Sequence, residues 1–145
     1  VIEKALLWDS PQNWWIDDFD LLDVTGDGLD DLTLSVWSEN DESIKNHFFV
    51  FGFIDGTYKP MWQSSNLDAP NCEFKIADLD YDGANDLAVI EGSYEEWPDC
   101  RGRYVAIWKW SGWGFSNEWR SERGVFQNLD IEQLGSRAVV GVDAF

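Results

Sequence analysis

The residues best suited to chemistry lie in one ten-residue run, Asp78 to Leu87 (DLDYDGANDL), with aspartates at its first, third, fifth and ninth positions and glycine at its sixth. Calcium takes six to eight oxygen ligands, and alternate aspartates in a tight loop can turn toward one centre. The glycine permits the turn. An EF-hand would need Glu at position 12, where Val89 stands, and the β-branched-rich run 87–90 predicts a strand instead of a helix. The predicted ligands are the side chains of Asp78, Asp80, Asp82 and Asp86 and the carbonyl of Ala84.

The run Asp23 to Leu32 (DVTGDGLDDL) repeats this pattern, with Thr25 at the third position. Its predicted ligands are the side chains of Asp23, Thr25, Asp27 and Asp31 and the carbonyl of Leu29. It has one carboxylate fewer than the other run, so we expect it to bind calcium more weakly. Acidic turns without metal are the alternative interpretation. Two loops in the same register favour two bound calcium ions.

A third copy, Asp130 to Val139, keeps acids at its first and third positions and Gly135 at its sixth. Leu134 and Ala138 stand where the fifth and ninth positions need carboxylates. We therefore expect a loop of the same shape that binds no metal.

The acidic runs recur with a period of about 50 residues, and a Trp-x-Ser marker at Trp8, Trp62 and Trp119 precedes each of them. Short strands at such a period are typical of propeller blades. The expected strands span 16–22, 32–37, 47–53, 57–63, 73–77, 87–92, 103–110 and 114–120. We predict one all-β domain, 1–145, of antiparallel propeller-like blades in an incomplete or open propeller. Its two full repeats are 11–64 and 65–121, its partial third is 122–145, and 1–10 resemble the last strand of a preceding unit.

The two acidic loops resemble those of FG-GAP or VCBS repeats, which occur in the β-propeller of integrin α chains and in many exported bacterial proteins. The resemblance implies a calcium loop between the first two strands of each blade, with the ligands given above. It covers nearly the whole chain, although the third copy departs from the pattern. Fewer than three blades are present, whereas a closed propeller has four to eight.

Composition excludes several partners. The chain has 28 acidic and 10 basic residues, a formal net charge of −18 and an isoelectric point near 4.1. Nucleic acid is excluded because phosphate binding needs a basic surface, and no run of about 18 apolar residues predicts a membrane span. We expect the only cysteines, Cys72 and Cys100, to form a disulfide, with two buried free thiols as the alternative. A disulfide and calcium together favour an extracytoplasmic location, periplasmic or secreted.

The sequence predicts that the protein is not an enzyme. The single histidine, His47, lies in an apolar run and suits a structural role. No serine occupies a nucleophile elbow, and acidic pairs carry little information in so acidic a chain.

Binding of a basic protein is the favoured function. The loop 93–102 combines acids with aromatic residues, a composition suited to a basic partner surface, and its predicted contacts are Tyr94, Glu95, Glu96 and Trp97. A solvated crossover is the alternative. Small exported VCBS-type proteins include some that resemble lysozyme inhibitors and immunity proteins, which makes an inhibitor a concrete hypothesis. Two other functions stay open. One is carbohydrate binding through Trp14, Trp15, Trp110 or Trp113, with Trp62 and Trp119 kept in the core. The other is a self-assembling subunit of an extracellular filament or adhesin.

Overall fold

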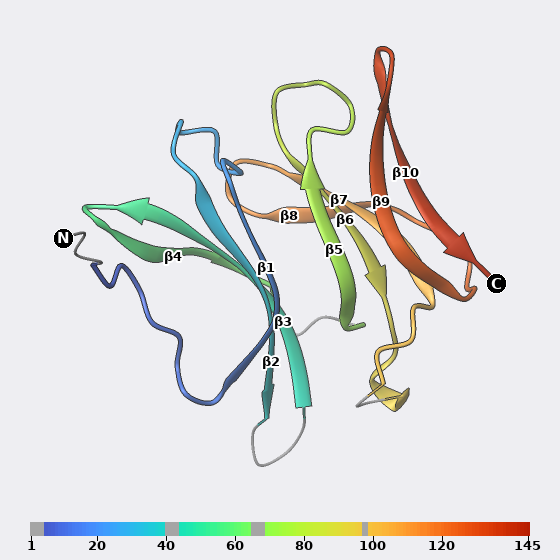
Figure 1. The fold of residues 1–145 in the computed structure, drawn as a ribbon, viewed down its shortest axis with the longest axis horizontal. Coiled ribbons are helices and arrows are strands. Elements are labelled where there is room, and N and C mark those ends of the chain that lie inside the picture. Colours follow the sequence, from blue (N-terminus) through green and yellow to red (C-terminus); the bar gives the residue numbers. More distant parts are fainter. Residues whose placement is uncertain (1–4, 40–43, 65–68, 97–98) are drawn as a thin grey trace.

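The computed structural model describes residues 5–39, 44–64, 69–96 and 99–145. The described chain is all-β, with two four-stranded antiparallel sheets and one hairpin (Figure 1). The strands are β1 (Trp14–Leu22), β2 (Asp31–Glu39), β3 (Ile44–Ile54), β4 (Thr57–Gln63), β5 (Asn71–Ala77), β6 (Asp86–Glu91), β7 (Tyr104–Trp110), β8 (Phe115–Arg120), β9 (Phe126–Leu134) and β10 (Arg137–Ala144), with one 3-10 turn, η1 (Tyr94–Glu96). None of the described helical structure is long and apolar enough to cross a membrane.

Each predicted repeat contains one up-and-down sheet. Strands β1 to β4 form the first sheet in sequence order, β5 to β8 form the second, and β9 pairs with β10 alone. The strands β1 to β8 fall where the sequence predicts them, with ends that differ from the expected ones by at most three residues. The all-β fold, open and without a closed barrel, is confirmed.

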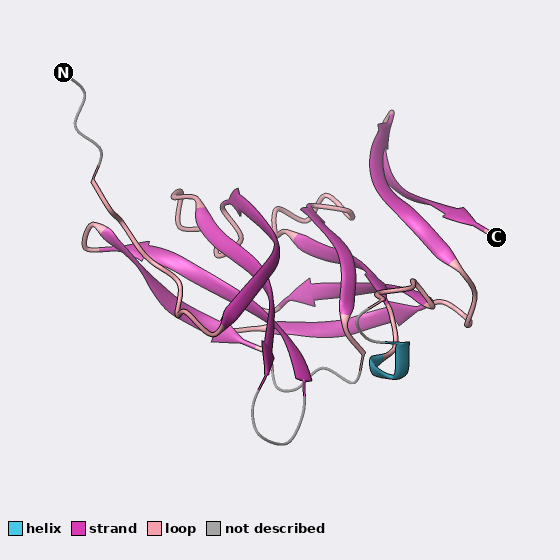
Figure 2. Cartoon of the chain, turned by 60° about the horizontal axis from the view of Figure 1, so that its bottom comes forward, coloured by secondary structure: helices cyan, strands magenta, loops and turns pink. Residues whose placement is uncertain are grey.

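The core lies on both faces of the second sheet. One face packs against the first sheet through Phe48 and Val50 of β3 and Phe74 of β5. The other face packs against the hairpin through Ile90 of β6 and Leu129 of β9. Every residue of β6 is buried because that strand is covered on both sides. Figure 2 shows the hairpin standing at one end of this stack.

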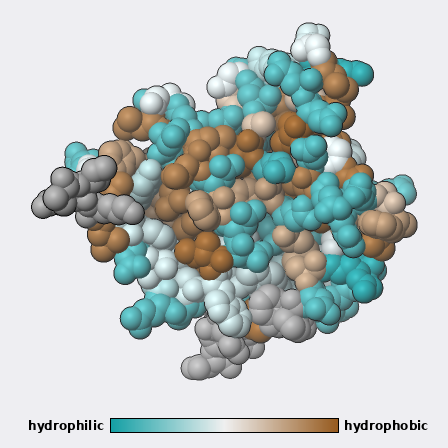
Figure 3. Space-filling view, viewed as in Figure 1, coloured by the Kyte–Doolittle hydropathy of each residue, from teal (hydrophilic) through white to brown (hydrophobic). Residues whose placement is uncertain are grey.

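The outer face of the first sheet carries a separate apolar cluster of Leu34, Val36, Phe49 and Phe51. Two tryptophans near the N-terminus, Trp8 and Trp14, pack against this cluster. Residues 5–10 form no strand. On the face shown in Figure 3, apolar surface gathers over β1.

One covalent link lies within the second sheet unit, and polar links join the sheets to their neighbours. Cys72 and Cys100 form the expected disulfide, with their Cα atoms 5.3 Å apart. The buried Asn46 side chain of β3 accepts a hydrogen bond from the Asn71 amide of β5 at 3.0 Å, which joins the first sheet to the second. Glu73 of β5 accepts hydrogen bonds from two backbone amides at the start of β9, which fixes the hairpin on the second sheet.

Two sequence expectations about the fold were wrong. The segment after Asp130 is no calcium-type loop, because β9 continues to Leu134 and Gly135, at φ 64°, lies in a two-residue turn to β10. Without carboxylates to order a longer loop, a tight hairpin is the simpler connection. Trp119 is not a core residue: it is 52% exposed, since the two-stranded hairpin covers less of the second sheet than a full blade would. Its counterpart Trp62 is half-buried against the second sheet.

Candidate metal centre

The two acidic loops share one backbone path. Each loop joins the first two strands of a sheet, and its last aspartate is the first residue of the second strand, Asp31 of β2 or Asp86 of β6. Both loops have positive φ at their fourth and sixth positions: Gly26 and Gly28 in the first, Tyr81 and Gly83 in the second. Glycine adopts this conformation without strain, whereas a tyrosine there is uncommon.

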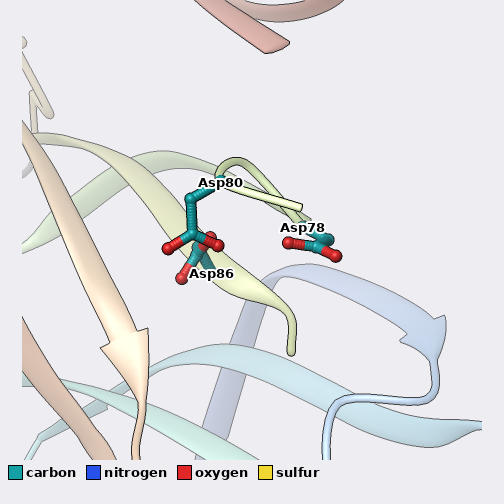
Figure 4. A group of neighbouring side chains, drawn as sticks. All are labelled: Asp78, Asp80 and Asp86. Atoms are coloured by element: carbon teal, nitrogen blue, oxygen red, sulfur yellow. The ribbon is translucent and has the colours of Figure 1, made fainter. Parts of the chain in front are cut away.

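Three carboxylates converge in the second loop. One oxygen each from Asp78, Asp80 and Asp86 lies within 4.8 Å of the others (Figure 4). Ligands of one calcium ion are separated by at most twice the metal–oxygen distance, or about 5 Å. The spacing therefore fits a single hard cation between these three side chains. Asp82, the fourth predicted ligand side chain, lies outside this group, with its Oδ1 accepting a hydrogen bond from the Ala84 amide at 2.9 Å.

Asp86 supplies an independent sign that the second loop takes a cation. Its side chain is 1% exposed, and its Oδ2 accepts a hydrogen bond from the Leu79 amide at 2.9 Å. Its Oδ1 is buried without a hydrogen-bond partner. Burial raises the pKa of this carboxyl group. A buried carboxylate oxygen without a partner is costly, and a bound cation would offset that cost.

The first loop also holds its carboxylates by hydrogen bonds from backbone amides. Asp23 accepts hydrogen bonds from Gly26 and Gly28 at 2.7 and 2.9 Å, and the buried Asp31 accepts two from the Val24 and Thr25 amides at 2.8 Å each. Among the residues described in this loop, the carboxylates form no group as tight as that in the second loop. Burial raises the pKa of Asp31, as it does for Asp86.

The seventh position of each loop has the same local contact. The amide of Leu29 donates to Asp27 Oδ1, as the amide of Ala84 donates to Asp82 Oδ1, each at 2.9 Å. The carbonyl groups of Leu29 and Ala84 stay predicted ligands.

Sequence reasoning missed two residues of the site. Lys109 of β7 reaches the second loop, with its Nζ 2.6 Å from the Oδ2 atoms of both Asp80 and Asp82. Asn85, at the eighth position of the second loop, donates to the Asp23 carbonyl of the first loop, so the two loops contact each other. The pattern of either loop alone gives no signal for these contacts, because strand pairing and sheet packing create them.

The predicted partner-binding loop is held at both ends. Glu96 forms an ion pair with Arg103, which lowers the pKa of the Glu96 carboxyl group. The Tyr94 hydroxyl accepts a hydrogen bond from the backbone N–H of Asn46 at 3.2 Å, which ties Tyr94 to the first sheet. Glu95 is exposed, and Trp97 lies outside the described residues.

The remaining predicted residues are scattered over the fold. The His47 ring nitrogen Nδ1 lies 3.1 Å from the Ser64 carbonyl oxygen, a structural contact. Of the proposed sugar-binding tryptophans, Trp110 is buried, which contradicts its assignment as a stacking platform, whereas Trp15 and Trp113 are exposed. Trp14 stacks on Phe49, with ring centroids 4.5 Å apart.

Comparison of the chain with protein-family models, with curated proteins and with solved structures found no match. The resemblance to FG-GAP or VCBS repeats therefore stays a prediction, carried by the spacing of the two loops. The geometry of the second loop, and not a relative, is what supports a metal centre in this chain.

Proposed function

We propose that the protein is a calcium-stabilised, exported, non-enzymatic binding protein with a basic protein as its partner. The observation that carries this proposal is the group of Asp78, Asp80 and Asp86, in which a buried carboxylate oxygen has no partner. All three donors are carboxylate oxygens, the ligands that calcium prefers. The first loop would hold a second ion once Asp23, Thr25, Asp27 and Asp31 turn toward a common centre.

Calcium would stabilise the contact between the first two sheets. Each loop links two strands, and Asn85 joins one loop to the backbone of the other. An ion that binds only the folded loops stabilises the folded protein by mass action. The Cys72–Cys100 disulfide supports an oxidising compartment, where calcium concentrations are also high enough to fill such sites.

A basic protein is the partner that the charge favours. The formal net charge is −18, so two calcium ions would leave the surface strongly acidic. Such a surface attracts cationic partners and speeds their association. The loop around η1 is tied down through Tyr94, Glu96 and the disulfide, which leaves Glu95 exposed on a fixed support. An inhibitor of a basic cell-wall-degrading enzyme would fit this chemistry.

Calorimetric titration with calcium tests the metal centre. We expect two sites in the wild-type protein, loss of one in Asp82→Ala and loss of the other in Asp27→Ala. Glu118→Gln, which removes an exposed acid of β8 outside both loops, is the matched control and should keep two sites. A wild-type protein that binds no calcium at millimolar concentration would refute the proposal.

Association kinetics with a panel of basic lysozymes test the partner. Glu95→Lys should slow association, and more strongly at low salt, because a rim charge acts through long-range attraction. Glu118→Lys makes the same change of charge on β8 and is the control. Equal slowing by both variants would place the contact surface elsewhere, and the absence of binding to any basic protein would contradict this part of the proposal.

Carbohydrate binding is the second candidate, favoured by Trp113, which is 79% exposed. An exposed indole face can stack on a sugar ring. Glycan-array binding that Trp113→Ala abolishes would support this function over the first. Self-assembly into a filament is the third, and light scattering at increasing protein concentration would reveal it.

A further inference from the structure

The charge of the second loop is not the charge of its aspartates alone. We infer that Lys109 is a tethered cation that occupies the calcium loop 78–86 in the ion-free protein and thereby lowers the affinity of that loop for calcium. The inference rests on the proposed calcium binding. It adds a residue, 23 positions beyond the loop's last aspartate, that sets the affinity of the site.

Strand pairing brings Lys109 to the loop. Lys109 of β7 stands opposite Asp86, the first residue of β6, in the antiparallel register. Its Nζ lies 2.6 Å from Asp80 Oδ2 and 2.6 Å from Asp82 Oδ2. Asp80 is also a member of the three-carboxylate group. The ammonium group therefore contacts carboxylates that calcium would need.

The protonation of Lys109 is consistent with this role. Its hydrogen bond to Asp80, and then that to Asp82, raises the pKa of Lys109 above its ordinary value of 10.5. The same lysine lowers the pKa of Asp82. Lys109 is thus a full positive charge at any physiological pH.

Among the described residues, no lysine stands at the matching position beside the first loop. Leu32 of β2 pairs with Phe51 of β3, so the residue opposite Asp31 is Gly52. A Cβ at Gly52 would lie 3.6 Å from Asp31 Oδ1, which places this position beside the carboxylate, as Lys109 is beside its own loop. The two loops therefore differ at this matched position, which is Lys109 beside the second loop and Gly52 beside the first.

Counting charges removes the difference in affinity that the aspartates alone predict for the two sites. The second loop has four aspartates among its predicted ligands, and the first has three with a threonine. The ammonium of Lys109 cancels one carboxylate, so both loops present the same formal charge to an incoming ion. The advantage predicted for the second loop is available only after Lys109 has been moved or removed.

Calcium binding would expel the lysine from the loop. An ammonium next to a divalent cation is repelled strongly in a partly desolvated site. Lys109 has a flexible stem and a side chain that is 33% exposed, so its Nζ can turn into solvent. Calcium must then replace two ion pairs, and the affinity of the second loop falls by the free energy of breaking them.

Calorimetric titration of Lys109→Met, with Lys59→Met as the control, tests the inference. Lys59 forms an exposed ion pair with Asp55 on the hairpin of β3 and β4, so the control removes the same charge and a similar contact away from both loops. We expect Lys109→Met to bind calcium about tenfold more tightly at one site and Lys59→Met to leave both sites unchanged within about twofold. Adding Asp82→Ala to Lys109→Met should abolish the tightened site.

Thermal unfolding in calcium-free buffer supplies a second readout, in which Lys109→Met should lower stability although it raises calcium affinity. Lys109→Met should melt a few degrees lower than the wild-type protein, because its carboxylates lose their counter-ion, and the difference should disappear in excess calcium, where the tighter binding offsets the lost ion pairs. Two calcium sites that are unchanged by Lys109→Met would overturn the inference while leaving the proposed calcium binding intact. The absence of calcium binding in both proteins would overturn the two together.

Discussion

The buried Asn46 side chain offers the most direct test of how the two sheets are joined. Its Nδ2 donates to the Ser35 hydroxyl and to the Val36 carbonyl, each at 3.2 Å, within the first sheet. Its Oδ1 accepts from the Asn71 amide of the second sheet at 3.0 Å. The perturbation that we propose is Asn46→Ala, which removes all three side-chain hydrogen bonds and leaves the backbone of β3 in place.

The magnitude follows from the groups left without partners. The Asn71 residue is 4% exposed, so its amide would become a buried unsatisfied donor, at a cost of about 1–3 kcal/mol. The two hydrogen bonds donated by Asn46 add about 0.5–1.5 kcal/mol each. We expect Asn46→Ala to lower the free energy of unfolding by about 3 kcal/mol, a large single-residue effect. For a chain of this length the melting temperature would fall by about 6–12 °C.

Urea unfolding in calcium-free buffer, followed by tryptophan fluorescence, measures this effect without a contribution from bound ions. The midpoint should fall while the dependence of the free energy on urea stays the same, since the surface exposed on unfolding is unchanged. Asn117→Ala removes the same atoms from an exposed position of β8 and should change stability by less than about 0.5 kcal/mol. A loss below about 1 kcal/mol for Asn46→Ala would refute the view that this side chain joins the sheets.

Three further predictions concern the hairpin, the disulfide and pH. Gly102→Ala should prevent stable folding or lower the melting temperature by more than about 10 °C, as measured by circular dichroism on heating. The reason is that the alanine Cβ would lie 2.2 Å from a backbone carbonyl oxygen of β9, which cannot move aside. Replacing Cys72 and Cys100 with alanine should lower the free energy of urea unfolding by about 3 kcal/mol, since the bond closes a loop of 28 residues; an unchanged midpoint would contradict it. Burial raises the pKa values of Asp31 and Asp86 above 3.8, so the folded protein binds more protons than the unfolded chain above that pH. The calcium-free protein should therefore gain stability in urea as pH falls toward about 4, whereas the calcium-loaded protein should lose it, because protons then compete with the metal; the same direction in both would count against the burial of these acids.

Local patterns in the sequence were enough to predict the strands β1 to β8 and the two acidic loops between strands. Each loop is specified within ten residues, by aspartates that accept hydrogen bonds from nearby amides and by glycines at positive φ. Those contacts are short in sequence, so the pattern of residue types carries them. Short apolar runs and glycine turns likewise predicted these strands. The presence of only two cysteines predicted the disulfide between them.

Long-range packing decided the remainder. The sequence spacing could not show that Asp86 is buried with one oxygen unpartnered, since burial comes from strands on both sides of β6. Trp62 and Trp119 occupy the same position of the repeat, yet only Trp62 is covered, because a complete sheet packs over it and a hairpin packs beside Trp119. Lys109 is remote from its loop in sequence, and only the register of β7 on β6 brings its charge to the carboxylates. The pattern of residue types therefore indicates which residues could hold a cation, whereas packing sets the charges and neighbours around them, because electrostatic energy depends on distance in space and not along the chain.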